Sequence, residues 1–470
     1  MNLILILLGK FITKISQFLN IGFGSTWPGH LVLKINDKFI ENVINKYKNL
    51  KIIVIAGTNG KTTSTALLKF LLEKSGHKVF TNSEGANLLN GVASTIIKNI
   101  NIFFQLKYDF AIFESDEFNL PLLLKKISPD KILILNLFRD QLDRYGEVNT
   151  IALKWLESLK VLSAKTEVFI NGDDPQLYYI GTKLTQKVQY FGVETNLMKL
   201  KNIPHDVDSI FCPVCLSLLH YHQLSFAHLG DFYCSNCQFK RSGKVIDFSQ
   251  EKISYPMEGL YNVYNSNAIL LLFKSLIDEQ FVIPVKTGIQ TKITFSVLNE
   301  WLSDFLPAFG RQEEIIYKNH KIFILLSKNP AGFNQSIQTV SEMIRKKPSF
   351  ASPFAKASGD KKASKGKANF LIILNNRIPD GLDVSWIWDV DFKPILDVAG
   401  NVYATGDRLY DLNLRLRYEN NKNIINTFED LSTAIESIVN KTKEGERLFI
   451  LPTYSAMLEV RKILLGRKLL

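Results

Sequence analysis

One stretch of the chain has the residue types and spacing of a phosphate-binding loop. It reads G-T-N-G-K-T-T and lies between an apolar run of strand type, Ile52–Ala56, and a helical pattern. In such loops, backbone N–H groups and the helix N-terminus bind anionic oxygens, the lysine reaches the outer phosphates of a nucleotide, and the hydroxyl meets Mg²⁺. The first glycine of the longer G-x-x-x-x-G-K-[ST] pattern is missing, and the alternative is a Gly-rich turn before a core helix. The residues that we predict to bind ATP here are Gly57, Thr58, Asn59, Gly60, Lys61, Thr62 and Thr63.

An acidic segment supplies a candidate metal ligand. It reads E-S-D-E and begins with Glu114, the last residue of the predicted strand Phe110–Glu114. In open α/β sheets, ligands bind beyond the carboxyl ends of the strands. We therefore predict that Glu114 and Thr62 hold Mg²⁺, and that Lys61 and Glu114 act in catalysis. The alternative is a solvated acidic turn. A charged segment after the next predicted strand, residues 136–147, is expected at the same edge of the sheet.

All four cysteines fall into the pattern C-x₂-C-x₁₈-C-x₂-C, at Cys212, Cys215, Cys234 and Cys237. Four thiolates make a closed tetrahedral shell for Zn²⁺, and the two C-x-x-C turns let paired sulfurs converge. A complete Cys₄ shell leaves no open position for water, so we predict a structural zinc ribbon. Disulfides are the alternative, which a cytosolic setting disfavours.

Two further polar residues are candidates for contacts with the nucleotide. Asn262 lies in a segment rich in asparagine that opens a helix, and its side chain can cap that helix or hydrogen-bond a base edge. Arg311 follows Gly310 just past a predicted domain boundary. An arginine there can close onto the nucleotide phosphates when two domains meet.

The sequence pattern indicates an α/β fold for the elements that must position these residues. Residues 51–192 alternate short apolar runs with helical patterns, which indicates a mostly parallel sheet flanked by helices, and a similar pattern returns after residue 307. The predicted strands are Ile52–Ala56, Phe110–Glu114, Ile132–Asn136, Val168–Asn171, Ile322–Leu326, Phe370–Leu374, Val402–Ala404 and Leu448–Leu451.

The length of 470 residues allows two to four domains. We predict a helical or extended lead-in at 1–50, a central ATP-binding domain at 51–306 with the zinc ribbon inserted at 205–248, and a C-terminal α/β domain at 307–470. The segments 284–293 and 351–368 have the character of insertions. The second is rich in Ala, Ser and Lys, and we expect it to be a disordered surface loop.

The formal net charge of +12 suits anionic nucleotides, an anionic lipid-linked substrate or nucleic acid, and does not choose between them. The apolar start of the chain is interrupted by Lys10 and Lys14 before it reaches a membrane-spanning length. A helical stripe there is expected to be core or interface rather than a bilayer anchor, and no secretory signal is predicted. We expect a cytoplasmic protein that acts at the inner face of the membrane. The stripe consists of Ile4, Leu8, Phe11, Ile15 and Phe18.

Together these segments resemble the Mur ligase superfamily of ATP-dependent peptidoglycan enzymes. The phosphate loop, Glu114, Asn262 and the Gly310-Arg311 pair look like that superfamily's nucleotide loop, magnesium glutamate, adenine contact and start of the C-terminal domain. The closest resemblance is to the MurT-type subunits of lipid II isoglutaminyl synthase. The resemblance therefore implies a Mur ligase-like central P-loop ATPase domain with an inserted Cys₄ zinc ribbon, and a C-terminal α/β domain. The further similar stretches are residues 22–29, 136–147, 171–175, 328–335, 380–389, 406–408 and 451–454.

This resemblance implies amidation through an acyl phosphate. ATP would phosphorylate the α-carboxylate of D-glutamate in the lipid II stem peptide, and ammonia would displace the phosphate to give D-isoglutamine. All four cysteines are assigned to zinc, so no free thiolate is left to release ammonia from glutamine. A separate glutaminase subunit is therefore expected, and the resemblance implies that it is a class I glutamine amidotransferase that forms a heterodimer with this chain. The family also implies that an aspartate of this subunit completes the partner's Cys-His pair, and Asp383 is our choice over Asp380 and Asp389. The alternative is that Asp383 only caps the segment that follows it.

Two other functions are alternatives. The first is a ligase that adds an amino acid, as in folylpolyglutamate or amino-acid-adding Mur enzymes, and the ribbon and the segment 380–389 argue against it. The second is a zinc-ribbon ATPase that binds nucleic acid. Its basic residues would then be interleaved with aromatic ones, which the sequence does not show, so we expect no nucleic-acid partner.

Overall fold

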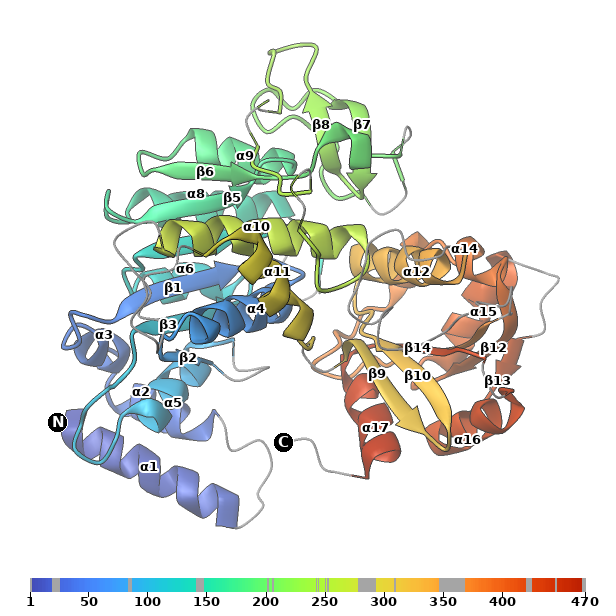
Figure 1. Ribbon diagram of the computed structural model, residues 1–470, viewed down its shortest axis with the longest axis horizontal. Helices are drawn as coiled ribbons and strands as arrows, with labels where there is room; N and C mark the ends of the chain where they lie inside the picture. Colours follow the sequence, from blue (N-terminus) through green and yellow to red (C-terminus); the bar gives the residue numbers. More distant parts are fainter. Residues whose placement is uncertain are drawn as a thin grey trace.

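The structure is a computed structural model of the chain. It describes residues 2–18, 26–82, 87–140, 148–200, 203–204, 207–241, 243, 245–249, 251, 253–277, 293–307, 310–345, 368–419, 425–443 and 446–466. Two six-stranded sheets, each covered by helices, lie next to each other, and a small hairpin projects from the first (Figure 1).

The first sheet is parallel throughout and has the strand order β2-β3-β1-β4-β5-β6. Its central strand β1 reads K-I-I-V-I-A and is buried on both faces, which is typical of a parallel sheet between two helical layers. The chain fills one side of β1 before it crosses to the other. The strands are β1 (Lys51–Ala56), β2 (Val79–Thr81), β3 (Phe110–Ser115), β4 (Lys131–Ile134), β5 (Glu167–Asn171) and β6 (Val188–Phe191).

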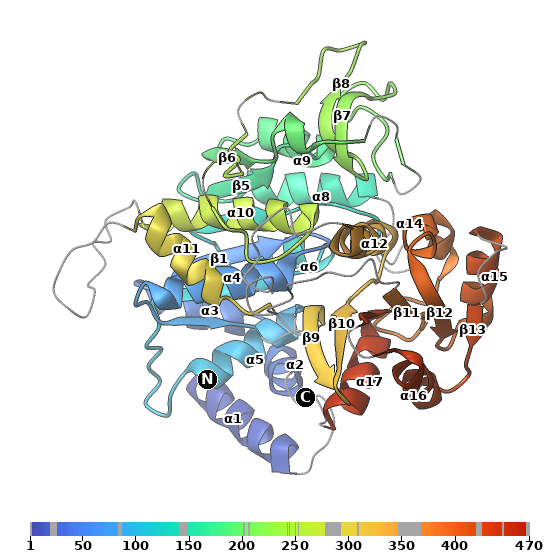
Figure 2. The same ribbon diagram turned by 45° about the vertical axis from the view of Figure 1, so that its right-hand side comes forward.

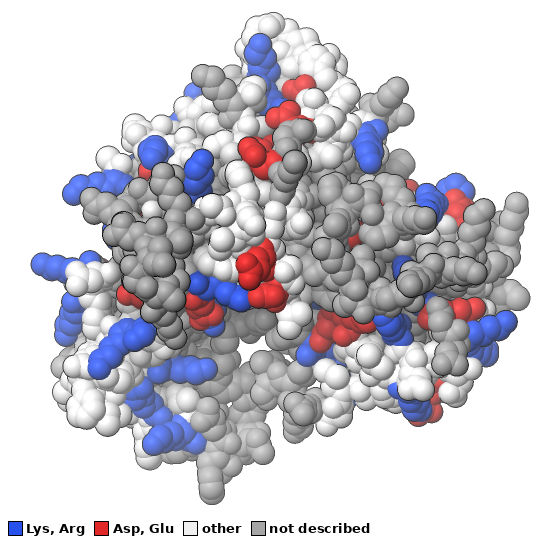
Figure 3. Space-filling model, viewed as in Figure 1, with Lys and Arg blue, Asp and Glu red and all other residues white. Residues whose placement is uncertain are grey.

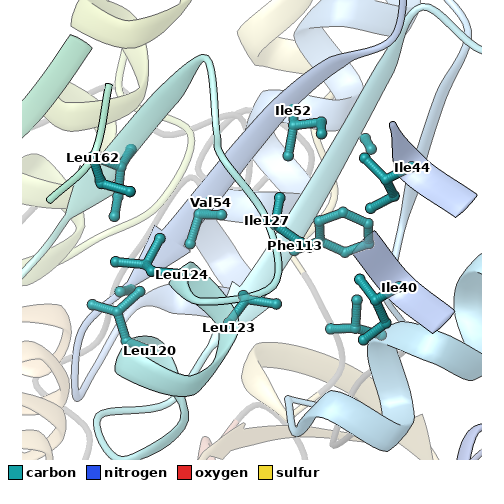
Figure 4. Close-up of a cluster of buried hydrophobic side chains, with 14 of the residues drawn as sticks. Ile40, Ile44, Ile52, Val54, Phe113, Leu120, Leu123, Leu124, Ile127 and Leu162 are labelled. Atoms are coloured by element: carbon teal, nitrogen blue, oxygen red, sulfur yellow. The ribbon is translucent and has the colours of Figure 1, made fainter. Parts of the chain in front are cut away.

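Alternate residues of β1 face the two helical layers. Ile52 and Val54 join a core with the helices of one face, part of which Figure 4 shows, whereas Ile53 and Ile55 pack with those of the other. The first layer contains α2 (Trp27–Ile35), α3 (Phe39–Ile44), α5 (Leu89–Asn99), α6 (Asn119–Leu124), α8 (Val148–Lys160) and α9 (Pro175–Thr182). The second contains α4 (Lys61–Lys74), α10 (Leu260–Ile277) and α11 (Phe295–Asp304).

The second sheet has the order β13-β12-β11-β14-β10-β9 and is parallel except for its edge strand β9. Its strands are β9 (Arg311–Tyr317), β10 (His320–Leu325), β11 (Ala368–Ile373), β12 (Ala399–Thr405), β13 (Ile425–Thr427) and β14 (Leu448–Pro452). Its helices are α12 (Pro330–Arg345), the 3₁₀ turn η2 (Ser385–Asp389), α14 (Lys393–Leu396), α15 (Leu409–Glu419), α16 (Leu431–Lys441) and α17 (Tyr454–Leu465). Figures 1 and 2 place α12 beside α10 of the first unit.

The hairpin of β7 (His220–Phe226) and β8 (Leu229–Tyr233) projects beyond β6, after the short 3₁₀ turn η1 (Thr195–Leu197). A buried ion pair joins Arg241, which follows the hairpin, to Asp173, with Nε 2.6 Å from Oδ1. The hydroxyl of Tyr264 on α10 donates to the same carboxylate at 2.7 Å. The hairpin is therefore fixed to the first sheet by buried polar contacts.

The helix α1 (Asn2–Phe18) packs against α2 and α5 with a face different from the predicted one. Leu5, Ile6 and Gly9 are buried, whereas Ile4, Leu8 and Phe11 are exposed. These three residues therefore do not belong to the core, and of the two expected roles, core or interface, only interface remains a prediction for them. Gly9 explains the difference, because its missing side chain lets α1 approach Ile97 closely. The side chains of Ile15 and Phe18 lie outside the described residues.

All eight predicted strands are confirmed, with ends that differ by at most three residues. The predictions missed the short or edge strands β2, β6, β9 and β13, and they named no strand within the ribbon, where β7 and β8 lie. The segments expected to be insertions, 284–293 and 351–368, lie outside the described residues except for Ile293 and Ala368, the first residue of β11. Among the described residues, no helix has the length and apolar character that crossing a membrane requires.

Candidate nucleotide and metal sites

The predicted ATP-binding residues meet at the carboxyl edge of the first sheet. At this edge the chain leaves β3, which pairs with one side of β1, and crosses to β4, which pairs with the other side. Such a switch point leaves a crevice beyond the strand ends. The loop after β1, Glu114 at the end of β3 and Asn136 after β4 all lie at this edge.

The loop between β1 and α4 depends on two glycines with positive φ. Gly57 has φ 144° and Gly60 has φ 87°, conformations that side chains rarely adopt. A Cβ at Gly60 would lie 2.3 Å from Oδ1 of Asn265. Gly60 precedes the first residue of α4, and no side chain caps that helix N-terminus. The loop therefore presents uncapped backbone N–H groups at a helix N-terminus, which suits an anion.

Asparagine and threonine side chains hold the loop in place. Asn59 N donates to Oδ1 of Asn136 at 2.8 Å, and the amide of Asn136 donates back to the Asn59 carbonyl at 3.0 Å. The Thr58 hydroxyl exchanges hydrogen bonds with the backbone of Phe138 at 3.1 and 2.9 Å. The loop is thus preorganised by the residues that follow β4.

Lys61 is buried at the centre of the loop. Its ammonium donates to the carbonyls of Gly57 and Thr58 at 2.5 and 3.0 Å. Burial lowers the pKa of Lys61, while the nearby carboxylate of Glu117 opposes that change. Burial likewise raises the pKa of Glu117, with Lys61 opposing the rise. The two side chains are therefore buried near each other beside the phosphate loop, and each favours the charged form of the other.

Thr62, Glu114 and Arg311 come together although they are far apart in the sequence. The Thr62 hydroxyl donates to Oε2 of Glu114 at 3.0 Å and accepts a hydrogen bond from Nη2 of Arg311 at 3.1 Å. Burial raises the pKa of Glu114, and the Arg311 guanidinium opposes the rise. Adjacent oxygen ligands of an octahedral Mg²⁺ are about 2.9 Å apart, so the Thr62–Glu114 pair fits this ion.

The second sheet supplies the opposite wall of the site. The side-chain amides of Asn59 and Asn329 exchange hydrogen bonds of 3.2 and 3.1 Å. Lys328 forms an ion pair with Asp140. Burial alone would lower the pKa of Lys328, but Asp140 and Glu117 raise it above its ordinary value. A cation is thereby held opposite the phosphate loop.

A cleft of about 840 Å³ lies between these walls, and Asn262 and Arg311 both line it. The Asn262 amide donates to the Glu258 carbonyl at 2.7 Å, so it holds the start of α10 at the cleft surface. The hairpin adds apolar surface through Phe226, whose ring centroid lies 5.7 Å from that of Tyr264. Polar groups at one end and aromatic groups nearby are what a nucleotide site needs.

The four cysteines form one cluster. Their sulfurs all lie within 4.8 Å of one another, and the pairs Cys212–Cys237 and Cys215–Cys234 are 3.5 Å apart. These distances are too long for disulfides and close to the roughly 3.8 Å between thiolates around tetrahedral Zn²⁺. The donor set thus fits a four-coordinate metal.

The three candidate aspartates have different environments. Asp380 is buried and accepts from Ser455 N at 2.8 Å, and Asp389 pairs with Arg139. Asp383 is exposed and accepts from Ser385 N at 2.8 Å and from its hydroxyl at 2.9 Å. All three line a second cavity of about 440 Å³, which also includes Lys328.

Sequence reasoning missed several residues of this site. Lys328 and Asn329 were noted only as part of a similar stretch, and Glu117 was not separated from Glu114. A signal was present, because the segment after β10 repeats the strand-loop-helix order with a lysine in the loop. No signal in the sequence indicated the contact of Asn59 with Asn329, because this contact depends on how the two sheets pack against each other.

Comparison with known proteins agrees with this geometry. The Mur ligase middle domain model matches residues 55–273, and the MurT ligase C-terminal model matches residues 326–457. The structure resembles the MurF ligase from Thermotoga maritima in complex with ADP, with a TM-score of 0.58 and 16% identity over 92% of this chain and 82% of that one.

It also resembles the bifunctional folylpolyglutamate synthase/dihydrofolate synthase from Yersinia pestis, complexed with AMPPNP and Mn ion, with a TM-score of 0.52 and 14% identity over 90% of this chain and 91% of that one. At such identities the likeness shows the fold alone. The fold and the two family models define a protein of the Mur ligase class.

Two relatives narrow this class. The MurT subunit of lipid II isoglutaminyl synthase (glutamine-hydrolyzing) from Streptococcus pneumoniae is 30% identical over 98% of this chain and 97% of its own length. The MurT subunit from Staphylococcus aureus is 27% identical over 84% and 83%, respectively. The chain belongs to the family of MurT subunits of lipid II isoglutaminyl synthase.

Proposed function

We propose that this chain is the ATP-dependent subunit of a lipid II isoglutaminyl synthase in the cytoplasm. It would amidate the α-carboxylate of the stem-peptide D-glutamate to D-isoglutamine, in peptidoglycan biosynthesis. The observation that carries the proposal is the contact of Thr62 with both Glu114 and Arg311, next to the buried Lys61 of the phosphate loop. The chain is also similar to MurT subunits along nearly its whole length.

In the first step, a carboxylate oxygen of the substrate attacks the γ-phosphorus of ATP, the bond to the β-γ bridging oxygen breaks, and ADP leaves. The uncapped N-terminus of α4 would bind the phosphates, and the Lys61 ammonium would turn from the loop carbonyls to the γ-phosphate. Mg²⁺ held by Thr62 and Glu114 would neutralise charge that develops on the phosphoryl oxygens. Arg311 would move from Thr62 onto the phosphates.

In the second step, ammonia attacks the carbonyl carbon of the acyl phosphate, phosphate leaves with the bonding electrons, and the nitrogen loses a proton. Lys328 lines both cavities, so the second cavity adjoins the place where this step would occur. Asp383 lies on that second cavity as well. We place the entry of ammonia there, with a class I glutamine amidotransferase docked over Asp383.

The direct test is an amidation assay on lipid II with ATP and either ammonium or glutamine. We expect product from ammonium with this chain alone or with its glutaminase partner, and product from glutamine only when both are present. Failure with ammonium in the presence of both subunits would contradict the amidation proposal.

We propose that Asp383 completes the partner's Cys-His pair, because Asp380 and Asp389 are engaged within the chain whereas Asp383 is exposed. The Asp383→Asn variant is expected to lose glutamine-dependent amidation by as much as about 10⁴-fold. Its ammonium-dependent rate should stay within about twofold.

Asp391→Asn is the matched control for this variant. Asp391 is also exposed and also accepts a backbone hydrogen bond two residues on, from Lys393 N at 3.1 Å. If Asp383 only caps a turn, both variants will keep their glutamine-dependent rates, and the assignment to the partner's triad will be wrong.

We propose that the four cysteines bind one structural Zn²⁺. Because Phe226 and Leu229 of the hairpin line the nucleotide cleft, loss of the metal should loosen one wall of that cleft as well as the ribbon. Chelation or Cys212→Ser is expected to lower the melting temperature and to raise the KM for ATP severalfold.

Metal analysis of the purified chain should find one zinc ion per chain, and Ser235→Ala, an exposed change between Cys234 and Cys237, should retain it. A chain that is free of metal under reducing conditions, yet unchanged in melting temperature and KM, would contradict the zinc proposal.

A further inference from the structure

The outer face of α1 is apolar although it is exposed. Leu3, Ile4, Leu7 and Phe11 have exposed fractions of 50%, 68%, 49% and 61%. Their spacing places them on one side of the helix, together with Leu8. A surface helix usually presents charged and polar residues there, so this face is unusual for a helix that faces only water.

The surroundings of this face are basic. Lys10 and Lys14 lie on α1, and their mutual repulsion adds to burial in lowering the pKa of Lys10. The exposed side of the adjacent α2 carries Lys34. The first acidic residue of the whole sequence is Asp37, so neither helix contains one. In Figure 3, basic and uncharged side chains dominate the lower left, where Figure 1 places α1 and its neighbours.

The helix is fixed to the folded unit in an orientation that leaves this face outward. Gly9 allows close contact with Ile97 of α5, and the amide of Asn36 donates to Oδ1 of Asn2 at 3.0 Å. Seventeen residues extend only about 26 Å, which is shorter than a bilayer core of about 30 Å. With its other face packed on protein, α1 can lie on a membrane but cannot span one.

We propose that the outer face of α1 docks the enzyme on an anionic lipid surface. The apolar side chains enter the boundary between headgroups and acyl chains, and Lys10, Lys14 and Lys34 meet anionic headgroups. A second copy of this chain fits less well, because a symmetric contact would bring two basic, acid-free helices together. Docking does not depend on the proposed reaction, but it would hold the cleft next to a lipid-linked substrate.

The test is flotation of the full-length chain with vesicles that contain no lipid-linked substrate. Vesicles of phosphatidylglycerol and phosphatidylcholine should bind the protein at least tenfold better than phosphatidylcholine alone. Ile4→Gln/Leu7→Gln/Phe11→Gln should weaken binding to the anionic vesicles at least tenfold. Lys10→Gln/Lys14→Gln should remove most of the preference for anionic lipid.

Matched control variants distinguish binding through this face from non-specific binding of exposed apolar or basic side chains to vesicles. Leu153→Gln/Ile316→Gln/Leu414→Gln changes residues that are 60%, 72% and 60% exposed on other elements, and Lys160→Gln/Lys165→Gln removes two other exposed lysines. Both should bind vesicles like the unchanged chain. Equal losses in the controls, or no binding by the unchanged chain, would overturn the proposal.

Sedimentation of the same proteins tests whether the outer face of α1 instead binds a second copy of this chain or the glutaminase subunit. A dimer that the α1 triple variant dissociates, with no vesicle binding, would assign the face to a second copy and overturn lipid docking. Loss of vesicle binding when the glutaminase subunit is bound would assign it to that partner and also overturn the proposal. Amidation of detergent-solubilised lipid II should be unchanged in the triple variant, so that failure of docking and failure of the proposed reaction are told apart.

Discussion

The site is built from two strand-loop-helix units that face each other and work differently. The first loop, residues 57–60, joins β1 to α4, and the second loop, residues 326–329, joins β10 to α12. Each loop leads into a helix, and the loops touch through Asn59 and Asn329. Each unit also carries a lysine, which is buried in the first unit and partly buried in the second.

The difference lies in their backbones. The first loop has glycines with positive φ and no side-chain cap on the helix that follows. The second has no glycine, its helix begins with Pro330, and the Asn329 side chain accepts from Gly332 N at 2.9 Å. The first loop can therefore bind an anion with uncapped backbone N–H groups. In the second loop a side chain already accepts a hydrogen bond from the backbone N–H at the start of the helix, so this loop contributes a lysine instead.

The largest expected effect separates the two lysines. Lys61→Met should lower kcat for ammonium-dependent amidation about a thousandfold, because Lys61 lies inside the phosphate loop. Lys328→Met should lower the same kcat only about 10- to 100-fold, since Lys328 acts from the opposite wall of the cleft. Melting temperatures would identify any variant that fails to fold. An equal or larger loss for Lys328→Met would reverse the roles of the two loops.

A smaller effect is expected from replacing a glycine of the first loop or of the helix that follows the second loop. Gly60→Ala places a side chain at φ 87° and 2.3 Å from Asn265, so it should destabilise the fold by about 1–3 kcal/mol and weaken ATP binding. In Gly332→Ala the added Cβ would lie 2.9 Å from Oδ1 of Asn329 and in ordinary contact, at 3.6 Å, with Asn59. This variant should therefore lose less stability and less ATP affinity than Gly60→Ala.

Gly76→Ala is the control for strain alone, because Gly76 has φ 90° but a Cβ added there would meet no atom within 4 Å. It should cost about 1–2 kcal/mol of stability and leave the Kd for ATP unchanged. If Gly60→Ala behaves like Gly76→Ala, then the contact with Asn265 plays no part in shaping the loop.

The smallest effect concerns the contact between the loops. In a double-mutant cycle with Asn59→Ala and Asn329→Ala, we expect a coupling energy of about 0.5–1.5 kcal/mol in ATP binding. Calorimetric titration of the four proteins measures it. A coupling of zero would mean that the two loops bind nucleotide independently.

Much of the fold was predictable because it depends on local patterns. The buried strands are continuous apolar runs, and β1, β3, β10 and β14 were all found in this way. The strands β2 and β13 have only three residues each, too few for a pattern to stand out, and the half-buried β6 and β9 lack a continuous apolar run. On α1, periodicity identified a helix, but more than one of its faces carries apolar residues, and only packing decides which face joins the core.

The sequence alone determined the chemistry available to this protein. Glycines, a lysine and a hydroxyl at fixed spacing predict a phosphate loop, and four cysteines in two C-x-x-C pairs predict a metal shell, since both depend on neighbours along the chain. Only the tertiary structure decided that Arg311 lies on Thr62, that Lys328 faces the phosphate loop and that the outer face of α1 is exposed. These contacts join residues up to 270 positions apart, and they arise from how two sheets and their helices pack, which no local pattern encodes.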